Sequence, residues 1–403
     1  MKQKKATDFS LGLIRETVQW KGRDAVRLSN GIVELIGLAG GGHLAAFRFL
    51  EGDGRPSQNV FWEAPWRTSD PDREWSEDMS NQYGPVETGR FLSGFTGHAL
   101  CLDYFGEASP EKAAAGLGLH GEAAITRWNV LEPTELRMGQ CRWIVNLPIS
   151  RLTFERTIHI NEGESVAYVE ETVRNERDTE HRCDWVQHVT FGPPFLQCGA
   201  STINASAHSG MSSPFGYEGK SLLADDVYAS WPFVQRESGD GAADLRVPFV
   251  EKGRGFLAGM MLDPTRRIQH LVAINWSLRL GIGYCFRSDD FPWMAIWEEN
   301  CARQDVPWNG ATQARGMEFG TTPLPLTGNG GLADNRFSGT PRDCAIAAHG
   351  EKTARYLMFL FSVPAEVRSI KNVTPVSNAI LFHDVSGRTS FSIPAKGCEA
   401  FLS

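Results

Sequence analysis

The chain has 403 residues, 41% of them hydrophobic and 22% charged, and a formal net charge of −8. These values are ordinary for a soluble globular protein, and the absence of a basic cluster beyond Lys2–Lys5 argues against nucleic acid or an anionic membrane surface as a partner. No apolar run reaches about 18 residues, so no transmembrane helix is expected.

The cysteines and the amino-terminal residues indicate a chain that folds without disulfides. The eight cysteines are scattered and form no C-x-x-C pair, which argues against a zinc ribbon or a disulfide scaffold and favours buried, reduced thiols. Residues 1–20 carry positive charge but lack the long apolar segment of a signal peptide. We therefore expect a cytoplasmic protein.

The amino-terminal part of the chain predicts a hairpin followed by a long loop. Strand-like patterns cover Thr17–Trp20, Ala25–Leu28 and Ile32–Ile36, and the dipeptide Asn30-Gly31 is a strong signal for a tight turn. Residues 51–83 are rich in Asp, Ser, Pro and Trp with little periodicity, so they predict a loop over one face of the protein.

A glycine-rich segment, residues 116–128, contains a histidine and a glutamate two positions apart. Ser109–Ala115 before it has the signals of a short helix. On an extended strand, His120 and Glu122 would point to the same face, and Trp128 would offer a flat apolar wall. The segment therefore predicts part of a ligand site.

Residues 125–174 predict successive antiparallel strands. Thr153–Ile160 and Val166–Val173 read as a hairpin joined at Asn161–Gly163. A further strand precedes a Gly-Pro-Pro break, which places His188 near a strand end and Gln187 on the opposite face. We expect His188 to face a cleft.

Strand patterns resume after residues 201–241, which are polar and read as a loop. Glu318 then stands out as a carboxylate in apolar and small surroundings, and helical periodicity is scarce throughout. The pattern predicts an all-β protein built as a large antiparallel β-sandwich. We expect one domain over residues 1–403, with loop insertions near 51–83 and 201–241.

Four short segments resemble, in order, those of the galactose mutarotase (aldose 1-epimerase) superfamily. They are Tyr83-Gly84 with Gly89-Arg90, Leu119-His120-Gly121 with Trp128, Gln187–Phe191, and Gly316–Pro323. Glu122 stands where that family has a second glycine region. The resemblance implies a large β-sandwich with a sugar site on a concave sheet face. It also implies an aldose 1-epimerase activity on a small carbohydrate, without a cofactor.

The resemblance also implies roles for individual residues. His188 would be the general acid and Glu318 the general base, two groups that burial can tune toward neutral pH. His120 and Arg90 would hold sugar hydroxyls and support negative charge on oxygen. Three further residues complete the expected substrate-binding set, namely Glu122, Trp128 and Trp297.

Each of these residues also has a structural alternative. Glu318 could pair with Arg315 or Arg336, and Arg90 could pair with Glu87. Of the adjacent Glu298 and Glu299, at most one can reach a pocket.

Two other functions compete with the epimerase. One is a metal-dependent sugar lyase or isomerase, whose divalent ion would be held by N and O ligands. Its candidate ligands are His98, His120, Glu122, His188 and Glu318. The other is a carbohydrate-binding protein without catalysis.

Overall fold

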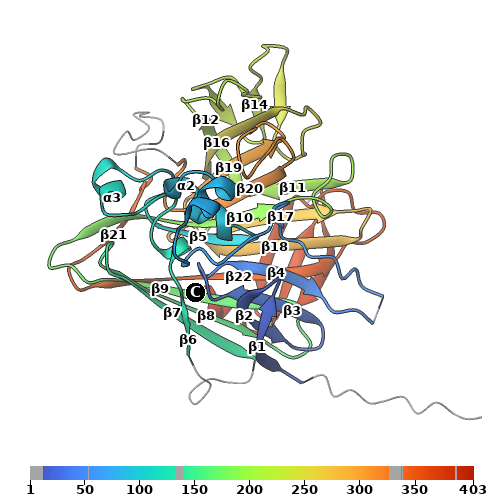
Figure 1. Cartoon of the computed structure of the whole chain (residues 1–403). Coiled ribbons are helices and arrows are strands. Elements are labelled where there is room, and N and C mark those ends of the chain that lie inside the picture. Colours follow the sequence, from blue (N-terminus) through green and yellow to red (C-terminus); the bar gives the residue numbers. More distant parts are fainter. Residues whose placement is uncertain (1–11, 53, 132–138, 326–336, 338, 386–387) are drawn as a thin grey trace, which may run out of the picture.

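The computed structural model describes residues 12–52, 54–131, 139–325, 337, 339–385 and 388–403. Residues 1–11 and Arg336, which entered the sequence predictions, lie outside these ranges. Within them the chain forms three antiparallel sheets and a few short helices (Figure 1). None of the described helices is long and apolar enough to cross a membrane.

The largest sheet carries most of the strands before residue 325. Its order is β1 (Ile14–Trp20), β2 (Arg23–Ser29), β3 (Val33–Leu38), β4 (Leu44–Phe49), β5 (His98–Asp103), β10 (His181–Phe191), β20 (Gln313–Gly320), β19 (Trp293–Asn300), β16 (Arg254–Leu262), β12 (Ala207–Ser212), β13 (Tyr228–Ser230), β14 (Phe233–Gln235) and β15 (Ala242–Asp244). A short strand, β21 (Cys344–Ile346), pairs with the beginning of β10.

Two further sheets and the helices complete the described chain. The second sheet has the order β11 (Ser201–Ala205), β17 (Ile268–Asn275), β18 (Leu280–Arg287), β22 (Glu351–Ser362), β9 (Val166–Asn175), β8 (Leu152–Ile160), β7 (Gln140–Leu147) and β6 (Asn129–Val130). The third contains β23 (Asn372–Val376), β24 (Ala379–His383) and β25 (Thr389–Pro394). The helices are α1 (Glu77–Tyr83), α2 (Val86–Gly94), α3 (Pro110–Ala114), the 3₁₀ turn Ala123–Ile125 and α4 (Cys398–Phe401).

Apolar side chains between the two large sheets form the main core. Strand β8 alternates buried and half-buried residues along its whole length, so that Phe154 and Ile158 face the first sheet. Each such fully buried side chain stabilises the fold by about 1.5–3 kcal/mol. On the other face of the second sheet, Phe359 and Phe361 pack against Phe382 of the small third sheet. The predicted β-sandwich is therefore confirmed.

Strand β10 lies near the middle of the largest sheet and has two different faces. It pairs with β5 on one side and with β20 on the other. Because side chains alternate along a strand, Gln187 points into the core between the sheets and His188 points to the outer face. Helix α2 covers that outer face, and its Phe91 and Leu92 pack there with Phe95.

Several local predictions are confirmed. Asn30 makes the expected turn, with its side-chain oxygen accepting hydrogen bonds from the backbone N–H groups of Ile32 and Val33. Ser109 caps helix α3 by accepting a hydrogen bond from the backbone of Lys112. The hairpin of β8 and β9 also has the predicted position.

Three local predictions are wrong. The predicted loop over residues 51–83 ends in helix α1, which begins where the Ser76 side chain accepts a hydrogen bond from the backbone N–H of Met79. The segment around His120 is a turn followed by a 3₁₀ turn, and His120 itself has a φ of 65°, so His120 and Glu122 do not share a strand face. Residues 201–241 contain β11, β12, β13 and β14 instead of one loop. Strands β11 and β12 consist largely of small and polar residues, which hide the usual strand pattern, and pairing with β17 and β16 determines their conformation.

Candidate active site

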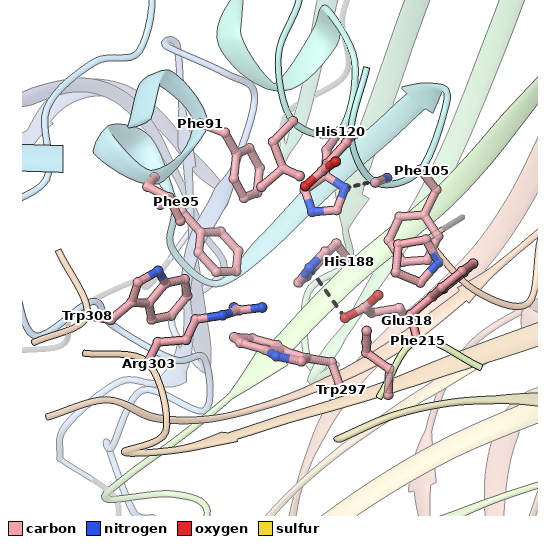
Figure 2. Close-up of a pocket in the computed structure, with 16 residues that line it drawn as sticks. Phe91, Phe95, Phe105, His120, His188, Phe215, Trp297, Arg303, Trp308 and Glu318 are labelled. Carbon is pink, nitrogen blue, oxygen red and sulfur yellow. Dashed lines mark hydrogen bonds and ion pairs between the residues drawn. The ribbon is translucent and has the colours of Figure 1, made fainter. Parts of the chain in front are cut away.

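A cavity of about 290 Å³ lies on the outer face of the largest sheet, beneath α2 (Figure 2). Aromatic side chains form most of its wall, and these are Phe91, Phe95, Phe105, Phe215, Trp297 and Trp308. The lining side chains that can carry a charge are Glu107, His120, His188, Arg303 and Glu318. A few polar groups in an aromatic enclosure are typical of a small-molecule site.

His188 and Glu318 meet on neighbouring strands at one side of the cavity. Gln187 of β10 lies opposite Phe319 of β20, and the same register brings His188 beside Glu318. His188 Nε2 lies 3.3 Å from Glu318 Oε1, while Nδ1 is 3.1 Å from the hydroxyl of Thr190. Figure 2 shows the contact inside the cavity.

Glycine at position 316 makes room for the Glu318 carboxyl group. A Cβ atom there would lie 2.1 Å from Glu318 Oε1, so any side chain would displace it. This oxygen is buried and, among the described residues, no donor makes a hydrogen bond to it. A buried acceptor without a donor is costly, so its retention at a cavity indicates a use for it.

Burial shifts both members of the pair toward their neutral forms. Removal from water lowers the pKa of His188 to about 4, and it raises the pKa of Glu318 well above its ordinary value. These shifts favour a state in which the carboxyl group of Glu318 carries the proton and the His188 imidazole is neutral. The imidazole Nε2 is then free to accept a proton.

His120 reaches the cavity from the turn before the 3₁₀ segment. The backbone N–H of Gly106 donates to its Nδ1 at 3.1 Å, so Nδ1 is an acceptor and the proton of the neutral ring is on Nε2. Burial lowers the pKa of His120 well below its ordinary value, which keeps the ring neutral. The ring stacks on Phe105, and Figure 2 shows its second nitrogen turned toward His188. His120 can thus donate one hydrogen bond to a ligand oxygen.

Arg303 enters the cavity from the loop after β19. Its Nε donates to Glu218 at 3.0 Å, and its guanidinium carbon lies 5.0 Å from the ring centres of both Tyr217 and Trp308. Figure 2 shows the guanidinium between Phe95 and Trp297, directed toward the His188–Glu318 pair. Sequence analysis missed this residue, because nothing in its spacing relates it to residues 120 or 188.

Trp297 lines the cavity, as predicted, but four other residues from the sequence analysis do not. Arg90 donates to the backbone carbonyl oxygens of Pro71 and Arg73, and its guanidinium lies over Trp75. Trp128 is buried in the core between the sheets, where its Nε1 donates to the carbonyl of Ala123.

Glu122 and His98 likewise have structural partners away from the cavity. The Glu122 carboxylate accepts hydrogen bonds from the backbone N–H groups of Ile149 and Ser150. His98 Nε2 is 2.9 Å from Gln187 Oε1, on the core side of the sheet. The five residues proposed as metal ligands therefore do not form one group, because His98 and Glu122 lie away from the cavity that holds the other three. Among all described residues, no three His, Cys, Asp or Glu side chains form a group that could hold a metal ion.

The neighbouring acidic residues have partners of their own. Arg315 pairs with Glu298 and not with Glu318. Glu299 accepts a hydrogen bond from the hydroxyl of Tyr217, and neither Glu298 nor Glu299 lines the cavity. Glu318 is thus left facing the cavity, with the neutral imidazole of His188 beside it.

Comparison with known proteins relates the chain to others by fold alone. No family model and no curated protein matches the sequence. A proposed aldose 1-epimerase from Klebsiella pneumoniae has a similar structure, with a TM-score of 0.58 and 15% identity over 88% of this chain and 84% of that one. A galactose mutarotase-like protein from Clostridium acetobutylicum gives a TM-score of 0.54 at 13% identity, over 88% and 99% of the two chains. The fold that the sequence resemblance implied is therefore confirmed.

Proposed function

We propose that this protein is a carbohydrate isomerase of the aldose 1-epimerase type, which interconverts sugar anomers by acid–base catalysis at His188 and Glu318. The observation that carries the proposal is the 3.3 Å contact between the two side chains inside an aromatic cavity. No donor in the described part of the chain makes a hydrogen bond to Glu318 Oε1. The mutarotase-like fold supports it as an analogy.

The chemistry needs one acid and one base close to the same carbon. A base takes the proton from the hydroxyl on C1, the bond between C1 and the ring oxygen breaks, and an acid gives a proton to that oxygen. Both oxygens are bonded to C1, so two groups as close as His188 and Glu318 can serve them together. Rotation about the C1–C2 bond and reclosure, with both proton transfers reversed, complete the change of anomer.

The resemblance assigns the acid to His188 and the base to Glu318, whereas burial favours the opposite starting state. With the proton on Glu318, the carboxyl group is the acid and His188 Nε2 is the base. Ring opening passes the pair into the reverse arrangement, and ring closure restores it. The single acid–base pair formed by His188 and Glu318 can therefore serve both ring opening and ring closure.

Other wall residues fit a sugar. The Nε2–H of His120 would donate to an oxygen that becomes negative during ring opening, which lowers the barrier. Trp297 and Phe95 offer aromatic faces to the C–H groups of a pyranose ring. A cavity of about 290 Å³ suits one monosaccharide better than a longer chain.

A cytoplasmic location is part of the proposal. All eight cysteines are free thiols, as expected for a protein in a reducing compartment. Cell fractionation with an antibody against the chain would test this, and recovery outside the cytoplasm would contradict it.

The proposal is tested by polarimetry or NMR exchange with a panel of free aldoses. We expect the wild-type protein to accelerate anomer exchange of at least one sugar, and His188→Ala to abolish the acceleration. No acceleration with any sugar would refute the activity. Tight sugar binding without turnover would instead identify a binding protein.

A further inference from the structure

We propose that Arg303 makes this cavity selective for an aldose that carries a carboxylate, that is, a hexuronate. The inference rests on the proposed function for the position of the sugar, and it adds the chemical class of substrate. The Arg303 guanidinium in the cavity wall is held in place by its neighbours, but its Nη groups are left to bind a ligand.

The Arg303 side chain is fixed by its surroundings before any ligand arrives. Its backbone N–H donates to Glu299 at 3.1 Å, and Glu299 also accepts from the hydroxyl of Tyr217 at 2.7 Å. That hydroxyl accepts in turn from Trp297 Nε1 at 2.8 Å. The aromatic rings around the guanidinium are therefore tied to one another, and little side-chain freedom is left to lose on binding.

Within the described part of the chain, the hydrogen-bond partner of the guanidinium lies at its Nε edge. Nε donates to Glu218, whereas among the described residues no acceptor bonds to either Nη atom of Arg303. The side chain lines the cavity and points toward His188 and Glu318 (Figure 2). Two Nη groups in this position present a planar pair of donors to a ligand, which is the geometry that matches a carboxylate.

The charges around the cavity favour a single negative charge on the ligand. Burial raises the pKa of the Glu318 carboxyl group and so favours its neutral form, which weakens its repulsion of an anion. Arg303 is the cation among the described lining residues, and Glu218 already balances part of its charge. Glu107 adds an exposed carboxylate to the wall. A dianionic phosphate would therefore lack a second cation, whereas a carboxylate needs only one.

A hexuronate also places its charge at a suitable distance. Its carboxylate is attached to C5, which flanks the ring oxygen on the side opposite C1. When C1 is beside the His188–Glu318 pair, the carboxylate carbon is separated from C1 by only the ring oxygen and C5. The guanidinium approaches the pair through the same cavity (Figure 2).

The test compares ligands that differ only at C6. Isothermal titration calorimetry is used with D-glucose, D-glucuronate and D-glucose 6-phosphate, and with the galactose and mannose series. We expect one hexuronate to bind about 10- to 100-fold more tightly than the neutral hexose of the same stereochemistry. A charge-assisted hydrogen-bonded pair makes a difference of this size. We expect the 6-phosphate to bind more weakly than the hexuronate.

Two variants locate the preference. Arg303→Gln should reduce hexuronate affinity to that of the neutral hexose, with neutral hexose binding retained. Arg355→Gln is the matched control, because Arg355 also donates Nε to a glutamate, Glu170, and lies over an aromatic ring, but on the second sheet. It should keep the full preference, and thermal denaturation should show both variants folded.

Failure of this inference is distinguishable from failure of the proposed function. His188→Ala should lose anomer exchange yet keep the preference for the hexuronate. Equal affinity for hexose and hexuronate, a preference that survives Arg303→Gln, or tighter binding of the 6-phosphate would overturn the inference. Absence of anomer exchange with a preserved hexuronate preference would overturn the proposed function alone.

Discussion

The two faces of β10 carry two clusters of polar side chains that differ in how completely they are paired. On the core face, both oxygens of the Glu171 carboxylate accept hydrogen bonds. The donors are Arg156 Nε at 2.7 Å, Gln187 Nε2 at 2.6 Å, Trp185 Nε1 at 3.2 Å and the Tyr356 hydroxyl at 3.1 Å. On the outer face, His188 follows Gln187 on β10 and lies beside Glu318 of β20. Among the described residues, no donor makes a hydrogen bond to Glu318 Oε1.

This difference in pairing distinguishes Glu171, a structural carboxylate, from Glu318, the carboxylate that we propose is catalytic. Both residues are buried, so burial alone does not identify a site. Glu171 is held by a guanidinium and three neutral donors, which stabilise its charge and leave nothing for a ligand. Glu318 instead faces a cavity and a neutral imidazole, with its pKa raised by burial. Replacing each glutamate by glutamine should therefore affect activity at position 318 and stability at position 171.

The largest effect is expected for catalysis in Glu318→Gln. An amide cannot exchange a proton with His188 or a sugar, so the rate of anomer exchange should fall by about 10²- to 10⁴-fold. NMR exchange measures the rate, and far-ultraviolet circular dichroism checks the fold. A variant with nearly wild-type turnover would remove Glu318 from the mechanism.

Glu171→Gln should act on stability instead. It leaves the buried Arg156 guanidinium without its counter-charge, which costs about 3–5 kcal/mol of unfolding free energy. Urea denaturation measures the loss. Folded Glu171→Gln protein should keep most of its turnover, and an unchanged midpoint would mean that the core pair contributes little.

The pH dependence of turnover should reflect the outer pair only. Below pH about 4 the imidazole of His188 gains a proton and the base is lost, so kcat/KM should fall about tenfold per pH unit. At the alkaline end, kcat/KM should fall as the pH rises through the raised pKa of Glu318. Rates across the pH range with a stable buffer series test this. An acid limb centred near pH 6.5, the ordinary histidine pKa, would contradict the burial argument.

Stability should also depend on pH through Glu318. Its pKa in the folded chain lies above the ordinary value of 4.5, so the folded state binds more protons than the unfolded state above that pH. The contribution of the neutral carboxyl group to stability is present at low pH and is lost as the pH rises. Glu318→Gln should therefore gain stability relative to wild type, by up to about 1.4 kcal/mol per pH unit from pH 4.5 upward. A difference that stays constant with pH would argue that Glu318 is ionised in the fold.

The smallest effect is expected for Arg90→Ala. Arg90 contacts backbone carbonyls and Trp75 outside the cavity, so turnover should stay within about twofold of wild type and stability should change by roughly 1 kcal/mol or less. A large loss of turnover in the folded variant would restore the role that the sequence resemblance gave it.

Alternation and ordered motifs predicted the part of the site that local sequence determines. Strand periodicity separated Gln187 from His188, and the structure has them on opposite faces of β10. The all-β class and the antiparallel β-sandwich followed from the same patterns.

The backbone conformation of His120 and the position of Arg303 depend on tertiary contacts, so sequence patterns could not predict them. His120 adopts a left-handed backbone because its N–H donates to the Gly106 carbonyl and because Gly121 packs against the Leu102 carbonyl. A Cβ at position 121 would lie 2.0 Å from that oxygen. Arg303 joins the cavity only through the packing of its loop against Tyr217 and Trp308. No spacing in the sequence reports such contacts.

The central claim, that His188 and Glu318 act as one proton-sharing pair, is tested most directly by a double-mutant cycle on the rate of anomer exchange. The rate is measured for wild type, His188→Ala, Glu318→Gln and the double variant with the same sugar. Because the two residues act as a unit, the double variant should lose no more activity than either single variant. No acceleration by the wild type, or a double variant whose loss is the product of the two single losses, would contradict the account.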